Sequence, residues 1–234
     1  MELLRKLYVF IRRKYRVFNK KKIVLLENEK LENTPFVIIA DNCWGGSVYQ
    51  WYDRPYNSPF VGLAIYGDCY IKLVSKFDYY MSKKLVFQNT SKYLFTGRLL
   101  NYPLGLLDDI EIHFVHYKNP EEAQEKWNRR KERMLKESNK DNYFFKMCDE
   151  WKADNEMLEK FHQLPIKNKI TFAQGDKEIV SRSNHIKIKE QKKMAHFEIT
   201  SSDQIAKLIV MAISLARINK PEDADTLYNI CKYE

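Results

Sequence analysis

The residues with the greatest chemical potential in this sequence follow a short apolar run. Residues 36–40, FVIIA, lead into a polar group made of Asp41, Asn42, Cys43, Trp44, Gly45 and Gly46. A continuous apolar run of this kind predicts a strand that is buried on both faces. A thiol at a strand-to-helix turn lies beside backbone N–H groups, which lower its pKa and stabilise an oxyanion. We therefore expect Cys43 to be a nucleophile and its neighbours to bind a ligand; a small buried thiol at a glycine turn is the alternative.

A second group of reactive side chains alternates with apolar residues in the segment DIEIHFVHY, residues 109–117. On a strand, Asp109, Glu111 and His113 point to one face and His116 points to the other. Burying such groups costs several kcal/mol unless they are paired. The pattern predicts either a functional face, with His113 or His116 as general base, or an edge strand with one solvated face. Glu111 and His113 are not a complete ligand set, so no metal site is predicted.

The elements that must position these residues alternate between strands and helices. The predicted strands are residues 22–26, 36–40, 85–88, 110–117, 143–148 and 169–173, and the predicted helices are residues 47–52, 67–83, 119–136, 154–161 and 201–217. This order predicts an α/β fold: a single three-layer domain with a mainly parallel sheet, preceded by a basic amphipathic N-terminal helix. We expect residues 1–27 to be the arm and residues 28–234 the domain.

Ligands bind such sheets at the carboxyl ends of the strands. The polar group at residues 41–46, His113 or His116, and Asp149 all follow predicted strands. We therefore expect these residues to converge on one cleft, with Asp149 among the ligand-binding residues.

The composition is that of a globular protein with reduced thiols. Of the 234 residues, 44% are hydrophobic, and the four cysteines are scattered. No apolar run reaches the roughly 18 residues that a membrane span needs, and the charged N-terminus does not resemble a secretory signal. We expect the protein to stay in the cytoplasm.

The net charge of +9 is concentrated in the N-terminal arm. Residues 1–22 contain nine lysines and arginines and one acid, a net charge of +8. Apolar residues recur in the same segment at helical spacing, as at Leu4, Leu7 and Ile11. A basic amphipathic helix can bind an anionic membrane surface, here the inner membrane face, or pack its apolar side on its own domain. The nearly neutral remainder does not favour nucleic-acid binding.

Several motifs resemble a family of bacterial proteins known by a domain of unknown function, number nineteen-nineteen. The motifs are NCWGG, PYNSPFVGL, YPLGLLDDIEIHFVHY, EEAQEKWNRR and LPIKNKITF, within about residues 35–172. Members are often labelled exopolysaccharide biosynthesis proteins, so the resemblance implies an α/β fold and work on cell-surface glycans. It carries over no catalytic residues. The Asn-Cys strand end is also similar to the GNCQ start of capsule-linked acyltransferases, although Asp41 and Trp44 replace the Gly and Gln.

Three functional hypotheses follow. The first is a transferase that modifies a surface polysaccharide or its lipid-linked precursor, by acyl transfer through Cys43 with an acyl-CoA donor and a glycan or glycolipid acceptor. The second is a glycosyl- or phospho-transferase that uses Asp108, Asp109 and Glu111. The third is a non-catalytic glycan-binding protein whose sugar-stacking side chains are Trp44, Tyr49, Trp51 and Tyr56.

Overall fold

The computed structural model describes residues 35–94, 100–174 and 185–188, together with residues 11, 18–19, 21–22 and 24–25. The chain divides into two compact units. One comprises Met1–Pro35, Ser47–Pro55 and Lys192–Glu234, and the other comprises Phe36–Gly46 and Tyr56–Gln191. All the elements described below belong to the second unit, except that helix α3 (Trp44–Trp51) includes residues of both.

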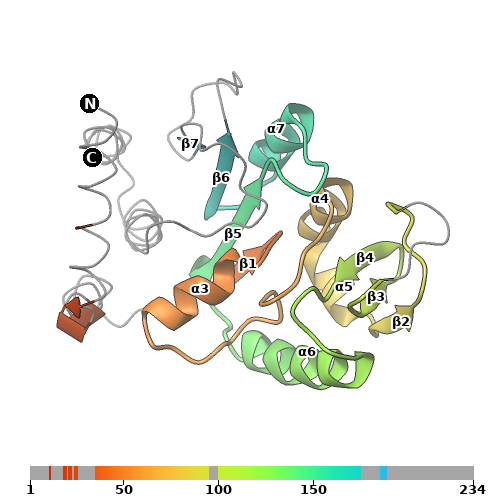
Figure 1. Cartoon of the computed structure of the whole chain (residues 1–234). Helices are drawn as coiled ribbons and strands as arrows, with labels where there is room; N and C mark the ends of the chain where they lie inside the picture. The colour runs from red at the N-terminus through yellow and green to blue at the C-terminus, as the bar shows by residue number, and fades with distance from the viewer. Residues whose placement is uncertain are drawn as a thin grey trace. The chain divides into compact units, whose positions relative to one another are not determined.

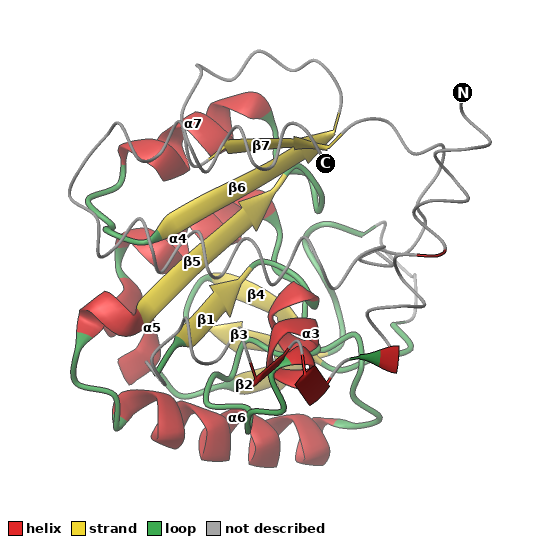
Figure 2. Cartoon of the chain, turned by 90° about the vertical axis from the view of Figure 1, so that its left-hand side faces the viewer, coloured by secondary structure: helices red, strands yellow, loops and turns green. Residues whose placement is uncertain are grey.

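A four-stranded parallel sheet, sheet A, confirms the predicted α/β class. Its order is β1 (Val37–Ala40), β5 (Tyr143–Cys148), β6 (Lys169–Gln174) and β7 (His185–Ile188), and Figure 2 shows the strands side by side. Val37 is in register with Tyr143, and Phe145 with Lys169. All four residues of β1 are buried, as expected for an apolar run that is covered on both faces.

A smaller antiparallel sheet, sheet B, was not predicted. It consists of β2 (Val86–Gln88), β3 (Leu104–Leu107) and β4 (Ile110–His113) in that order. The predicted strand at residues 110–117 is too long, because the N–H of Val115 turns back to donate to the carbonyl oxygen of His113 at 3.0 Å. The alternative of a solvated face on this strand is also wrong, since every residue of β4 is buried.

Helices pack against both sheets, and Figure 1 draws α4 and α5 between sheet A and sheet B. They are α4 (Gly67–Ser75), α5 (Phe77–Ser82), α6 (Pro120–Leu135) and α7 (Asn155–Gln163), with a short 3₁₀ turn at Lys140–Asn142. The helix predicted over residues 67–83 is interrupted at Lys76, whose φ and ψ of −133° and 49° are not helical. The predicted helix starts are confirmed: the side chains of Asn119 and Asp154 accept hydrogen bonds from Glu122 N and Met157 N.

Two further predictions concern the ends of the chain. The strand predicted at residues 22–26 is wrong, because the residues described there, Lys22, Val24 and Leu25, are helical. The helix predicted at residues 201–217 and most of the basic arm lie outside the described residues. Within the described part of the chain, we find no helix that is both long and apolar enough to span a membrane.

Candidate active site at the carboxyl ends of the strands

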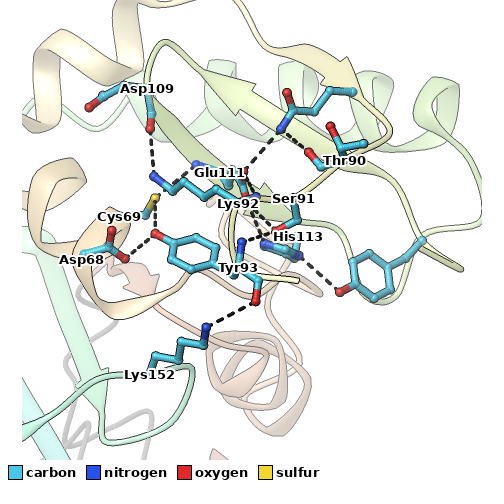
Figure 3. Close-up of polar contacts among 12 residues, drawn as sticks. Asp68, Cys69, Thr90, Ser91, Lys92, Tyr93, Asp109, Glu111, His113 and Lys152 are labelled. Carbon is cyan, nitrogen blue, oxygen red and sulfur yellow. Dashed lines mark hydrogen bonds and ion pairs between the residues drawn. The ribbon is translucent and has the colours of Figure 1, made fainter. Parts of the chain in front are cut away.

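The end of β4 carries a buried carboxylate, an imidazole and, beside them, a tyrosine hydroxyl. Glu111 and His113 share one face of the strand, and their side chains are 3% and 0% exposed. His113 Nε2 lies 3.4 Å from Glu111 Oε2, and the Tyr102 hydroxyl lies 3.2 Å from His113 Nδ1. Backbone hydrogen bonds of 2.8 and 2.9 Å between Ala64 and His113 fix the strand end that carries the ring. Figure 3 shows Glu111 and His113 at the centre of this group.

Glu111 is held in place by the last residue of β2 and by the segment that follows this strand. Ser91 Oγ donates to Glu111 Oε2 at 2.7 Å, and the backbone N–H of Lys92 donates to Oε1 at 2.8 Å. Gln88 Nε2 donates to Oε1 at 3.4 Å. These bonds compensate for the burial of the carboxylate and leave its Oε2 atom facing His113.

The electrostatic setting favours a neutral His113. Burial lowers the pKa of His113, and the nearby Glu111 carboxylate offsets only part of this effect. At neutral pH the ring therefore holds one proton, and the carboxylate beside Nε2 favours its placement on that nitrogen. Nδ1 is then left as an acceptor facing the Tyr102 hydroxyl. A carboxylate, an imidazole and a hydroxyl in this order can act as a general base.

Aromatic side chains surround the imidazole. The His113 ring centroid lies 5.1 Å from that of Tyr66, 6.4 Å from that of Tyr93 and 6.3 Å from that of Trp151. Tyr66 and Tyr93 stack with centroids 3.9 Å apart. These three residues were not predicted from the sequence, because they come from three separate segments. Tyr102 was not predicted because the hairpin of β3 and β4 that brings it to His113 was not recognised.

Asp41 belongs to a second buried cluster, at the ends of β1 and β5. Its Oδ1 atom forms a 2.9 Å ion pair with Lys146 Nζ. Its Oδ2 atom accepts from the backbone N–H of Cys148 at 2.8 Å. Asp41 and Lys146 are each 1% exposed, so this pair is a buried link between neighbouring strands. The sequence signal for this pair is the lysine within the apolar strand YFFKMC, and it was not recognised.

Asn42 connects this cluster to the loop after β5. Its Oδ1 atom accepts from Lys146 Nζ at 3.0 Å, and its Nδ2 atom donates to Glu150 Oε2 at 3.1 Å. Burial raises the pKa of Glu150. The acid that joins the cluster is therefore Glu150. Its neighbour Asp149, the predicted ligand residue, is half-buried and donates its backbone N–H to the Phe172 carbonyl oxygen at 3.2 Å.

Cys43 does not have the surroundings of an activated thiol. Its Sγ atom lies 3.6 Å from the carbonyl oxygen of Leu63, and within the described residues it forms no hydrogen bond to His113 or His116. Burial raises its pKa to about 11, which outweighs the opposing effect of Lys146. At pH 7 only about one molecule in ten thousand would carry the thiolate, the nucleophilic form.

The residues after Cys43 serve packing. Trp44 is 7% exposed, and its ring centroid lies 5.8 Å from that of Phe172. A Cβ atom on Gly45 would come within 3.0 Å of Ile38 Cγ2, and one on Gly46 within 3.1 Å of Val61 Cγ1. Both glycines therefore allow a close approach between protein segments.

The other predicted catalytic residues lie outside the His113 group. Asp109 is exposed and forms a 2.5 Å ion pair with Lys72, and Asp108 accepts from Tyr79 at 2.5 Å. His116 is exposed beyond the end of β4. No group of three or more His, Cys, Asp or Glu side chains in the described ranges is arranged to hold a metal ion.

Residues 63–65 lie between the two clusters. Ile65 N donates to the Asp41 carbonyl oxygen at 2.8 Å, while the adjacent Ala64 pairs with His113. After β5, Glu150 contacts Asn42 and the next residue, Trp151, contacts the His113 ring. The structure thus brings the Asp41 and His113 groups to neighbouring places at the carboxyl ends of β1, β5 and β4.

Two comparisons with known proteins bear on identity. The model of a family described as a domain of unknown function, DUF1919, matches residues 14–214. This range extends past the recognised motifs and includes part of the basic arm and of the C-terminal stretch. A protein of Haemophilus influenzae, named only as uncharacterized, is 36% identical over 143 residues, which are 61% of this chain and 64% of that protein. The match thus covers less than two thirds of the relative.

Proposed function

The chain belongs to the DUF1919 family, and from the His113 group we propose that it is a transferase acting on a hydroxyl of a bacterial cell-surface polysaccharide or its lipid-linked precursor. The observation that carries the proposal is the chain of contacts from Glu111 through His113 to the half-exposed Tyr102. The surrounding aromatic rings support a sugar as substrate, since aromatic faces pack well against the apolar faces of sugar rings.

Each residue of this chain has a distinct task in the proposed reaction. Tyr102 accepts the proton of the sugar hydroxyl and passes its own proton to His113 Nδ1. Glu111 holds the imidazole in the required tautomer and stabilises the imidazolium that forms. The buried position of His113 keeps it neutral and therefore basic at physiological pH.

Acyl transfer from an activated thioester such as acyl-CoA suits this arrangement. The sugar oxygen forms a bond to the acyl carbon, and the carbon–sulfur bond of the donor breaks. The proton held on the imidazolium returns through Tyr102 to the departing thiolate. Transfer is direct in this mechanism, because the high pKa of Cys43 does not favour an acyl-cysteine intermediate.

The basic arm gives the proposed enzyme a means of reaching its acceptor. Lipid-linked glycans lie at the inner membrane face, and residues 1–22 carry a net charge of +8. Such a segment is attracted to anionic lipids, which would hold the enzyme peripherally at that surface.

The proposal is tested on the glycan itself. NMR measures the acyl groups on polysaccharide from four kinds of cells. They express the wild-type protein, the His113→Gln variant, the Tyr102→Phe variant or no protein. We expect His113→Gln to match the cells without the protein and Tyr102→Phe to lose most of the acyl content. Identical glycan in cells with and without the protein would contradict the function. Full acylation with a folded His113→Gln variant would contradict only the mechanism.

A further inference from the structure

Two lysines beside the His113 group take no part in the proposed proton transfer. Lys92 Nζ lies 5.1 Å from the ring centroid of Tyr93 and donates to the carbonyl oxygen of Asp109 at 3.3 Å. Lys152 Nζ lies 5.6 Å from the same centroid and donates to the carbonyl oxygen of Tyr93 at 3.3 Å. Both side chains are exposed, and Figure 3 shows both lysines next to Tyr93.

Neither lysine forms an ion pair with a carboxylate in the described part of the chain. The Asp109 carboxylate is engaged by Lys72 at 2.5 Å, and the Asp68 carboxylate accepts the hydroxyl hydrogen of Tyr93. Among the described residues, Lys92 and Lys152 donate hydrogen bonds to carbonyl oxygens, which are neutral, and lie near aromatic rings. An ammonium group that has no ion-pair partner can donate a charge-assisted hydrogen bond to an anion.

The backbone at Trp151 and Lys152 is strained. Their φ angles are 52° and 57°, in the left-handed region that residues other than glycine rarely adopt. The carbonyl oxygen of Trp151 is fixed by a 3.0 Å hydrogen bond from Gly67 N. In this conformation the indole lies 5.5 Å from the Tyr66 ring, and Lys152 lies 5.7 Å from it. Strained turns of this kind cluster at ligand sites, and this one supplies both a ring and a charge.

We infer that Lys92 and Lys152 form a phosphate subsite and that the acceptor is a glycosyl phosphate. The phosphate ester binds the two ammonium groups, while the sugar lies against the half-buried Trp151 ring, with a hydroxyl at Tyr102. This inference rests on the proposed function and narrows its substrate class from any surface glycan to one whose reacting sugar carries phosphate. A lipid-linked sugar and a nucleotide sugar share this chemistry.

Binding of glucose and glucose 1-phosphate to the purified full chain, measured by calorimetry, tests the inference. We expect glucose 1-phosphate to bind about tenfold tighter or more, because charge-assisted hydrogen bonds add to the sugar contacts. The double variant Lys92→Gln/Lys152→Gln should bind both compounds equally. The matched control is Lys76→Gln, an exposed lysine beyond the far end of α4 from Gly67, which should leave the ratio unchanged.

Binding of UDP-glucose and of a short-chain prenyl diphosphoglucose distinguishes the two sources of phosphate. Tighter binding of the prenyl compound identifies a lipid-linked acceptor, and tighter binding of UDP-glucose identifies a nucleotide sugar. Equal affinity of the wild-type protein for glucose and glucose 1-phosphate would overturn the subsite and leave the proposed function standing, as would an unchanged ratio in the double variant. If none of the four compounds bound, the proposed sugar site itself would be overturned.

Discussion

Cys43 is half-buried and His113 is fully buried, and burial favours the neutral form of each. For the thiol this means a raised pKa and a loss of the nucleophilic thiolate. For the imidazole it means a lowered pKa and a ring that is free to accept a proton at neutral pH. The same physical effect therefore argues against Cys43 as a nucleophile and in favour of His113 as a base.

Replacement of Cys43 by serine should leave glycan acylation close to the wild-type level, because direct transfer does not use the thiol. With a pKa of about 11, Cys43 should also react with iodoacetamide at pH 8 about a hundredfold more slowly than glutathione. Mass spectrometry of the peptide that contains Cys43 measures this rate. Loss of acylation in Cys43→Ser, or fast labelling of Cys43, would restore the covalent mechanism.

The lowered pKa of His113 predicts a loss of stability in mild acid. Below about pH 6.5 the unfolded chain takes up a proton on this histidine more readily than the folded protein. The free energy of unfolding should therefore fall as the pH drops from 7 through 6.5 toward the folded-state pKa. Urea unfolding at several pH values measures this slope, and His113→Gln should flatten it. Equal slopes in the two proteins would show that His113 titrates normally.

At the scale of elements, the Asp41–Lys146 pair joins β1 to β5 at the edge where the site lies. Replacing Lys146 by methionine leaves the Asp41 carboxylate buried without its partner, which we expect to cost about 3–5 kcal/mol in the free energy of unfolding. The double variant Asp41→Asn/Lys146→Met removes both charges and should recover part of this loss. Urea unfolding measures the loss of free energy in Asp41→Asn, in Lys146→Met and in the double variant. A loss in the double variant equal to the sum of the two single losses would mean that the pair is not coupled.

Gly67 lets the start of α4 approach the loop before α7. A Cβ atom there would lie 2.8 Å from Ala153 Cα and 2.7 Å from Met157 Sδ. We expect Gly67→Ala to lower the free energy of unfolding by about 1–3 kcal/mol, because the backbone at Ala153 must move. Gly46→Ala, which faces only a side-chain methyl of Val61 at 3.1 Å, is the control and should cost less. An unchanged free energy of unfolding in Gly67→Ala would show that the backbone at Ala153 can move at little cost.

The helices and strands that were predicted correctly have local signals in the sequence. β5 matches its predicted residues, and α6 begins where Asn119, Pro120 and two acids predict a helix start. β3 was missed because its sequence, LGLL, has no β-branched or aromatic residue, although a two-residue turn joins it to β4. β7 was missed because it is only four residues long. The helix break at Lys76 was not predicted, because no glycine or proline lies at this position in the sequence.

The site was predictable only in part for the same reason. Alternation on a strand placed Glu111 and His113 on one face, and the end of an apolar run marked Asp41 and Asn42. Tyr102 reaches His113 through the hairpin of β3 and β4, in which Leu104 is paired with His113, and this hairpin was not predicted. The choice between Asp149 and Glu150 likewise depended on how the chain turns after β5, which is a property of the packed loop.

At the scale of the whole molecule, charge is separated along the chain. The net charge is +9, of which residues 1–22 contribute +8. An anionic membrane attracts each lysine or arginine near its surface with about 1 kcal/mol, although not all can reach the lipid at once. If the acceptor is lipid-linked, this attraction would hold the protein at the surface that carries the acceptor.

Deletion of residues 1–22 should therefore abolish binding to vesicles that contain anionic phospholipid while the remaining chain stays folded. Sedimentation with vesicles measures binding, and circular dichroism checks the fold. Binding of the full chain should weaken steeply between 0.1 and 0.5 M salt (roughly), since the Debye length falls from about 10 Å toward half that value. A matched variant in which Arg12, Arg13 and Lys14 become glutamine keeps the apolar residues and should bind with intermediate strength. Unfolding of the truncated chain would mean that the apolar side of the arm belongs to the core, and equal binding to neutral vesicles would remove the electrostatic basis for attachment.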